Sequence, residues 1–209
     1  MSLYQLNLAP SAASAVTVCA SQSPGAGAIT LNGSLVTAGV ATFAAAQLVT
    51  LVSGGNDAGI TFTITGTDAD GNTVTNDVTG AGIGTATSSK HFKTVTGITH
   101  TGSVAGTLTS GNSIDSVSPS FQTFRQGQLG RFSLGVLLVS GTATYETQDC
   151  YTNIKDAQES GTWISSTVFT AKTASFAASY GDLFPTAVRL RTTASSSGVL
   201  QGNFVCVKG

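Results

Sequence analysis

Charged side chains are scarce in this chain of 209 residues: Asp, Glu, Lys and Arg make up 9 % of it, against about 25 % in an ordinary soluble domain. The formal net charge is −1, so there is no basic field for nucleic acid and no polybasic surface for a membrane. No apolar run approaches the ~20 residues of a membrane-spanning helix. The start MSLYQLNLAPSAASAVTV lacks the positive n-region of a secretory signal. We therefore expect neither a nucleic-acid partner nor a membrane partner.

Cysteine is also rare. Cys19, Cys150 and Cys206 lie far apart and form neither a CxxC motif nor a metal-type spacing. This pattern favours buried free thiols. A single Cys150–Cys206 bridge within the C-terminal half is the alternative.

The usual signatures of catalysis are missing as well. The two histidines, His91 and His100, have no cysteine or carboxylate placed near them to complete a metal set, which favours surface or edge-strand positions. There is no G-x-S-x-G nucleophile elbow and no phosphate-binding loop. With only Glu146 and Glu159 as glutamates, paired-carboxylate chemistry would rely largely on Asp. We predict no catalytic residues, no cofactor and no enzymatic activity.

Threonine, serine and glycine fill the space that charged residues leave, with 32, 25 and 25 copies. Threonine suits a pleated strand because its side chain is β-branched, and glycine and serine supply turns. A chain poor in Glu, Lys and Arg is also a poor source of helices. The composition therefore predicts an all-β protein whose weakly charged surface favours association.

In short segments of the chain apolar residues alternate with polar ones, and turn-forming residues separate these segments every 8–12 residues. This pattern predicts a β-sandwich or barrel. Within 28–43, the Asn32-Gly33 pair predicts a tight hairpin turn. Within 59–80, Ile60, Phe62 and Ile64 alternate with threonines, and the polar segment 66–72 follows. That pattern predicts one antiparallel hairpin closed by a loop.

The regular spacing of expected strands and turns is interrupted at residues 113–132, where Pro119 and the first arginines occur. We therefore predict two consecutive antiparallel β-sandwich domains, Ig-like or jelly-roll-like, at residues 19–122 and 123–209. Residues 1–18 are predicted to be an extended N-terminal arm that lies across a neighbouring subunit, so that its removal would leave the fold intact. The apolar contacts of this assembly arm are Leu3, Tyr4, Leu6 and Leu8.

Asp68, Asp70 and Asn72 are the one calcium candidate, because they match ligand positions 1, 3 and 5 of an EF-hand loop. Position 6 should then be Gly and position 12 Glu, but the chain has Thr73 and Thr79 there. The pattern favours a plain hairpin bend and no metal site.

Trp163, Tyr145 and Tyr151 gather in the C-terminal half and form a candidate stacking platform for a glycan. The alternative is that Trp163 belongs to a sandwich core.

The phrases SPGAGAITLNG (23–33), GNDAGITFTITGTDADGN (55–72) and FKTVTGI (92–98) resemble small virion structural proteins of tailed bacteriophages. In the second half, GTATYETQDCYTNI (141–154) and FPTAVRL (184–190) look like the C-terminal sandwich that often follows. The resemblance implies a non-enzymatic subunit of the head decoration, cement or neck type, in a virion assembled in the bacterial cytoplasm. Its implied partners are further copies of itself and other virion proteins, such as the major capsid or neck proteins. A receptor- or glycan-binding tail or fibre module is the alternative.

Overall fold

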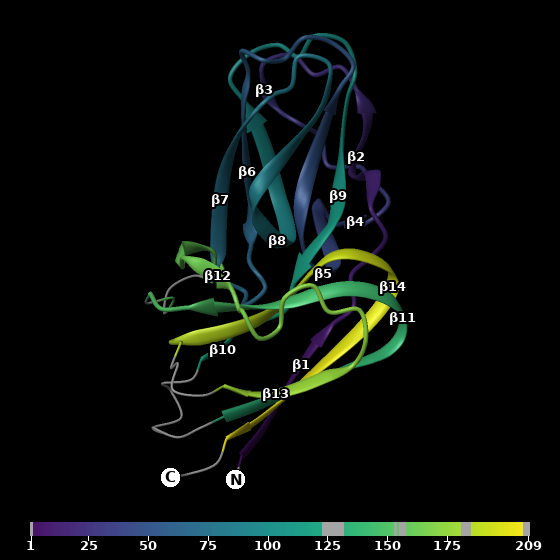
Figure 1. Cartoon of the computed structure of the whole chain (residues 1–209). Helices are drawn as coiled ribbons and strands as arrows, with labels where there is room; N and C mark the ends of the chain where they lie inside the picture. The colour runs from purple at the N-terminus through teal and green to yellow at the C-terminus, as the bar shows by residue number, and fades with distance from the viewer. Residues whose placement is uncertain (1, 123–131, 153, 155–157, 181–184, 207–209) are drawn as a thin grey trace. The chain divides into compact units, whose positions relative to one another are not determined.

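The computed structural model describes residues 2–122, 132–152, 154, 158–180 and 185–206 (Figure 1). In these residues 14 strands pair with one another as a single antiparallel sheet. The helical structure that they contain is one 3₁₀ turn, η2 (Gln158–Ser160). The all-β prediction is confirmed. The chain forms two compact units: unit 1 comprises Met1–Pro10 and Asp115–Gly209, and unit 2 comprises Ser11–Ile114.

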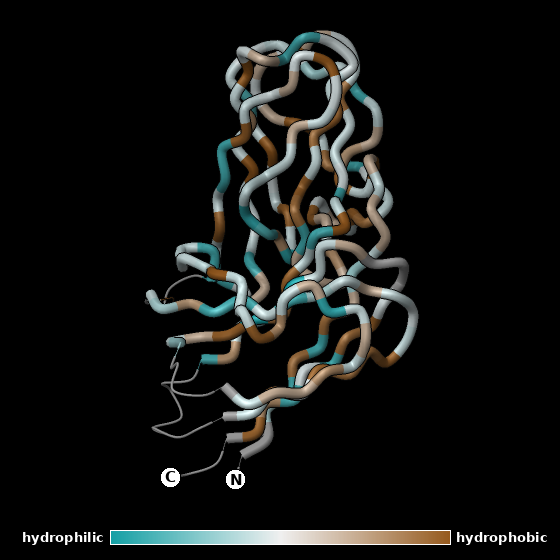
Figure 2. Tube along the Cα trace, viewed as in Figure 1, coloured by the Kyte–Doolittle hydropathy of each residue, from teal (hydrophilic) through white to brown (hydrophobic). Residues whose placement is uncertain are grey.

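Unit 2 is built around two long neighbouring strands, β5 and β8. Its strand order is β9-β5-β8-β6-β7, while β2 pairs with β9, β3 with β8 and β4 with β5. The bounds are β2 (Ser14–Gln22), β3 (Gly27–Ala28), β4 (Val36–Thr37), β5 (Val40–Ser53), β6 (Thr61–Thr67), β7 (Thr73–Thr79), β8 (Gly84–His100) and β9 (Leu108–Val117), the last of which continues into unit 1. Phe43, Phe62 and Phe92 are fully buried in its core. Outside such core positions most of the chain has intermediate hydropathy, as Thr-, Ser- and Gly-rich strands should (Figure 2).

The hairpin predicted for residues 59–80 is confirmed by β6 and β7. The two strands pair in register from Thr61↔Thr79 to Thr67↔Thr73. Phe62 and Ile64 are buried, so the alternation in the sequence does mark the core face of this strand.

The hairpin turn predicted at Asn32-Gly33 is wrong. The tight turn lies instead at Ala38-Gly39, between β4 and β5, where both residues have positive φ (51° and 79°) as a type I′ turn requires. Gly33 is needed for a different reason: a Cβ there would come within 2.3 Å of the Thr17 backbone. Its missing side chain permits close packing of two segments.

The expected surface position of the two histidines is also wrong. His91 and His100 are buried. Both lie on β8, where His91 pairs with Leu48 of β5 and His100 with Phe62 of β6, so neither is on an edge strand. The ring of His100 packs against Phe62, with 5.7 Å between centroids, and its Nδ1 is 2.7 Å from the Gly102 carbonyl oxygen.

Unit 1 is organised by β11 and β14, which pair antiparallel from Phe132↔Cys206 to Cys150↔Ala187. The first half of β11 also pairs with β13, and the last half of β14 with β1, which gives the order β13-β11-β14-β1. The other halves continue with β12 beside β11, and with β9 and β10 beside β14. The bounds are β1 (Ser2–Leu8), β10 (Phe121–Gln122), β11 (Phe132–Cys150), β12 (Trp163–Ser165), β13 (Phe176–Tyr180) and β14 (Ala187–Cys206).

The core of unit 1 joins residues from both halves of the long β14 strand. Phe121, which pairs with the first half of β14, stacks on Phe204 in its last half, with 4.7 Å between ring centroids. An added Cβ at Gly202 would lie 3.0 Å from Leu190 Cδ1. The two halves therefore pack against each other through these side chains.

The N-terminal segment differs from the expected arm. Residues 2–8 form β1, which pairs with β14 from Ser2↔Cys206 through Leu3↔Val205 to Leu8↔Leu200. Leu6 and Leu8 are buried in unit 1, and the Tyr4 ring lies 4.8 Å from that of Phe121. Because Tyr4, Leu6 and Leu8 alternate with polar residues, they share one face of the strand. Removing this segment would therefore take core residues away from unit 1.

The division of the chain also differs from the expected boundary near residue 122. It falls between Ile114 and Asp115, within β9, so one strand contributes to both units. Pro119 follows the end of β9, which fits its inability to donate a hydrogen bond to a strand ladder. The first arginines, Arg125 and Arg131, lie outside the described residues.

Cys19 and Cys150 are buried free thiols, as predicted, which excludes a bridge between Cys150 and Cys206. Burial raises the pKa of the Cys19 thiol above its ordinary value, so Cys19 is not activated as a nucleophile.

Candidate functional site

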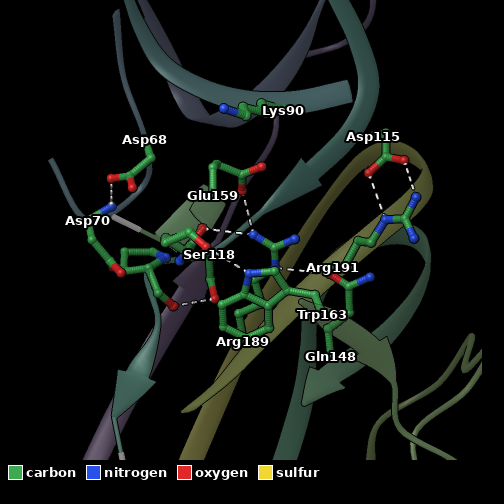
Figure 3. Close-up of polar contacts among 12 residues, drawn as sticks. Asp68, Asp70, Lys90, Asp115, Ser118, Gln148, Glu159, Trp163, Arg189 and Arg191 are labelled. Carbon is green, nitrogen blue, oxygen red and sulfur yellow. Dashed lines mark hydrogen bonds and ion pairs between the residues drawn. The ribbon is translucent and has the colours of Figure 1, made fainter. Parts of the chain in front are cut away.

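A polar assembly in unit 1 surrounds the buried guanidinium of Arg189 on β14. Its Nε donates to Gln148 Oε1 at 2.9 Å, and its Nη1 donates to Gln158 Oε1 at 3.0 Å and to Glu159 Oε1 at 2.6 Å. The Trp163 ring lies against it, with 4.2 Å from the guanidinium carbon to the ring centroid (Figure 3). We call these five residues the Arg189 cluster.

Four separate segments position the Arg189 cluster. Gln148 on β11 is the register partner of Arg189, so the sheet sets these two residues opposite each other. Trp163 begins β12, and its Nε1 donates to the Gln158 carbonyl oxygen at 2.9 Å. The side-chain amide nitrogen of Gln158, Nε2, donates to the Ser118 carbonyl oxygen at 3.1 Å. The cluster therefore fastens η2 and β12 to the strands of unit 1.

A second guanidinium, that of Arg191, lies two residues further along the same face of β14. Its Nε and Nη2 bind the Asp115 carboxylate in a bidentate pair, at 3.0 and 2.5 Å, and Nη1 binds Glu146 at 3.1 Å. The hydrogen bond to Asp115 raises the pKa of Arg191. Burial lowers the pKa of Arg189, and the Glu159 carboxylate opposes that shift.

The chemistry of these groups is that of a structural clamp. An arginine keeps its proton at any physiological pH and cannot act as a base, and both guanidiniums bind acceptors of the fold itself. Bidentate and charge-assisted hydrogen bonds of this kind hold segments in one geometry.

The structure does not bring the three predicted glycan-stacking residues together on an exposed platform. Tyr145 is 1 % exposed, and its hydroxyl donates to the Ala174 carbonyl oxygen at 2.7 Å. Trp163 presents a ring face to Arg189, and only Tyr151 is well exposed, at 46 %. A sugar cannot stack on Tyr145 without unfolding its surroundings.

Burial raises the pKa of Tyr145 to about 12, which predicts a late step in tyrosine titration. Because the folded pKa lies above the ordinary value near 10, the stability that depends on neutral Tyr145 is fully present below pH ~10. It is lost as the pH rises from there through about 12. In ultraviolet titration of tyrosinate absorbance, Tyr145→Phe should remove the last step, whereas Tyr151→Phe should leave it. A single common step near pH 10 for all tyrosines of the folded protein would contradict this prediction.

The calcium candidate is the loop that closes the β6–β7 hairpin. Asp68 Oδ1 accepts a hydrogen bond from the backbone amide of Asp70 at 2.9 Å (Figure 3). It accepts a second one from the backbone amide of Asn72, also at 2.9 Å. Gly71 adopts positive φ, which closes the turn. Asp68 therefore caps its own loop, a common role of aspartate in turns. Among the residues described, no group of three or more His, Cys, Asp or Glu side chains is placed to hold a metal ion.

The assembly residues lie on β1. Tyr4 is 40 % exposed, Leu6 and Leu8 are buried, and Leu3 is placed by its backbone pairing with Val205.

The Arg189 cluster was not predicted from the sequence, although the sequence contains one signal of it. Arg189 and Arg191 alternate within a predicted strand and so share a face. Two arginines on one face of a strand in a chain so poor in charge indicate nearby carboxylates.

No helix in the described ranges is both apolar enough and long enough to span a bilayer. No protein-family model matches the chain, and comparisons with curated proteins and with solved structures gave no match.

Proposed function

We propose that the chain is a non-enzymatic structural subunit of a tailed-phage virion, of the head decoration, cement or neck type. It stabilises the particle by contacts with further copies of itself and with other virion proteins, such as the major capsid or neck proteins. The resemblance of its sequence phrases to small virion structural proteins supports this proposal, and so does the distribution of charge in the folded chain.

The observation that carries the proposal is where the few charges lie. Of the thirteen charged residues that the structure describes, only Asp70 and Asp77 are well exposed, while four are buried and seven are partly exposed. Arg189, Arg191 and their carboxylates bind one another, and Asp57 and Asp68 are fully buried. The described surface therefore presents few well-exposed charges.

A neutral surface suits a building block better than a free soluble protein. Charge of one sign keeps proteins apart, and a surface without it promotes association. Uncharged hydroxyls take the place of charges on the strands, as in the cross-strand pairs Thr61↔Thr79, Thr65↔Thr75 and Thr67↔Thr73. In a symmetric particle many weak contacts of this kind combine into strong attachment.

We also propose that each unit is a β-sandwich. In unit 1 this is supported by the contacts of Phe121 with Phe204 and of Gly202 with Leu190, which join the two halves of β14. In unit 2 it is supported by a core cluster that contains residues of β2, β5, β6, β7, β8 and β9.

The test is to purify phage particles whose genome encodes this chain and to quantify the chain by mass spectrometry against the major capsid protein. We expect a fixed copy ratio that survives density-gradient purification, with matching density in electron microscopy. A host cytoplasmic protein from the same lysate is the control for carry-over. Absence of the chain from particles would refute the proposal.

A further inference from the structure

In the described residues, the edge strand β1 is paired on one side only. It pairs with β14 along its whole length, and in the described part of the chain no other strand pairs with it. The second side of an edge strand presents backbone N–H and C=O groups, which are a template for another chain.

Three other edge strands, β7, β12 and β13, carry features that discourage pairing. On β7, Asp77 is exposed, and the Thr75 carbonyl oxygen accepts a hydrogen bond from Lys90 Nζ at 2.9 Å. The β12 edge is three residues long. Near β13, the Lys172 ammonium lies 4.1 Å from the Phe176 ring centroid. Charged residues and short length are the usual protections of an edge strand.

β1 has none of these protections. Its seven residues, SLYQLNL, include no charge and no proline, and the pairing with β14 has no register shift. Gln5 and Asn7 are exposed, and their register partners on β14 are Asn203 and Gln201. The outward face beside this edge is therefore made of neutral amides.

We propose that β1 is the interface between copies: it pairs antiparallel with β1 of a second copy across a two-fold axis, so that the sheet order β13-β11-β14-β1 continues into the partner. An antiparallel strand is complementary to its own copy, because a two-fold axis brings each residue to the same strand running in the opposite direction. Neutral side chains avoid the like-charge repulsion that such symmetry would otherwise create. This inference rests on the proposed self-assembly and names the edge that makes the contact.

The test uses two oppositely charged double variants, Gln5→Lys/Asn7→Lys and Gln5→Glu/Asn7→Glu. Sedimentation velocity over a range of concentrations should show association of the wild-type chain and a loss of about tenfold or more in the association constant of each variant alone. An equimolar mixture of the two variants should restore association, because opposite charges then face each other. Since both side chains are exposed, each variant should melt near the wild-type temperature.

The matched control is Thr73→Lys/Thr75→Lys, which places the same charges at the same spacing on the exposed face of β7. It should associate as the wild type does. If the lysine variant of β1 associated as strongly as the wild type, the assignment of this edge would be overturned. Failure of the mixture of the two β1 variants to associate would overturn it as well. A wild-type chain that is monomeric at every concentration would overturn it too. The presence or absence of the chain in purified phage particles tests the proposed role as a virion subunit separately.

Discussion

Arg189→Met should lower the free energy of unfolding of unit 1 by about 3–5 kcal/mol, because it removes one partner of a buried ion pair. The Glu159 side chain is only 6 % exposed, so its carboxylate would keep a charge with no guanidinium beside it. The side-chain oxygens of Gln148 and Gln158 would lose a donor as well. Each buried acceptor left without its donor adds to the loss.

Urea denaturation followed by fluorescence measures this change directly, because Trp163 is the single tryptophan of the chain and lies on the Arg189 guanidinium. Arg191→Met is the matched control. Its side chain is 28 % exposed, so water can solvate the carboxylates that it leaves, and the loss should be smaller.

The double variant Arg189→Met/Glu159→Leu separates the loss of the Arg189–Glu159 ion pair from the loss of packing. Replacing both partners of a buried ion pair by apolar groups is often neutral, so the double variant should recover most of the stability that the single variant loses. If Arg189→Met alone unfolds at the wild-type urea concentration, the Arg189 cluster is no clamp.

Local patterns in the sequence predicted what depends on local physics. The alternation of Ile60, Phe62 and Ile64 marks a strand because side chains of a strand point to opposite faces by turns. The abundance of threonine and glycine predicted an all-β chain. These features need no knowledge of which strands become neighbours.

The errors come from contacts between distant segments. Asn32-Gly33 has the local preference for a hairpin turn, but Gly33 is placed by its close approach to Thr17. His91 and His100 look like surface residues, but both are buried in the folded chain, where the His100 ring packs against Phe62. Tertiary contacts override local preference at such positions.

The Arg189 cluster was beyond prediction for the same reason. Its members come from residues 148, 158–163 and 189, which meet only when β11, η2, β12 and β14 are in place. Sequence could indicate that Arg189 and Arg191 share a face, but not that Glu159 would be the partner of one and Asp115 that of the other.

Leu8→Ala should lower the free energy of unfolding of unit 1 by about 2–5 kcal/mol, as truncation of a buried leucine does. Leu8 is fully buried and pairs with Leu200, so the variant leaves a cavity in the core of unit 1. A free arm would not behave in this way, because an arm that orders only on assembly adds nothing to the stability of the isolated chain.

Asn7→Ala, on the exposed face of the same strand, is the matched control and should change stability by no more than about 0.5 kcal/mol. Both variants are compared by urea denaturation at equal concentration, since association through β1 would add to the apparent stability. Equal stability of Leu8→Ala and Asn7→Ala would mean that residues 2–8 do not belong to the folded core. The β1 edge would then be absent from the isolated chain, and the pairing of copies through it would have no template.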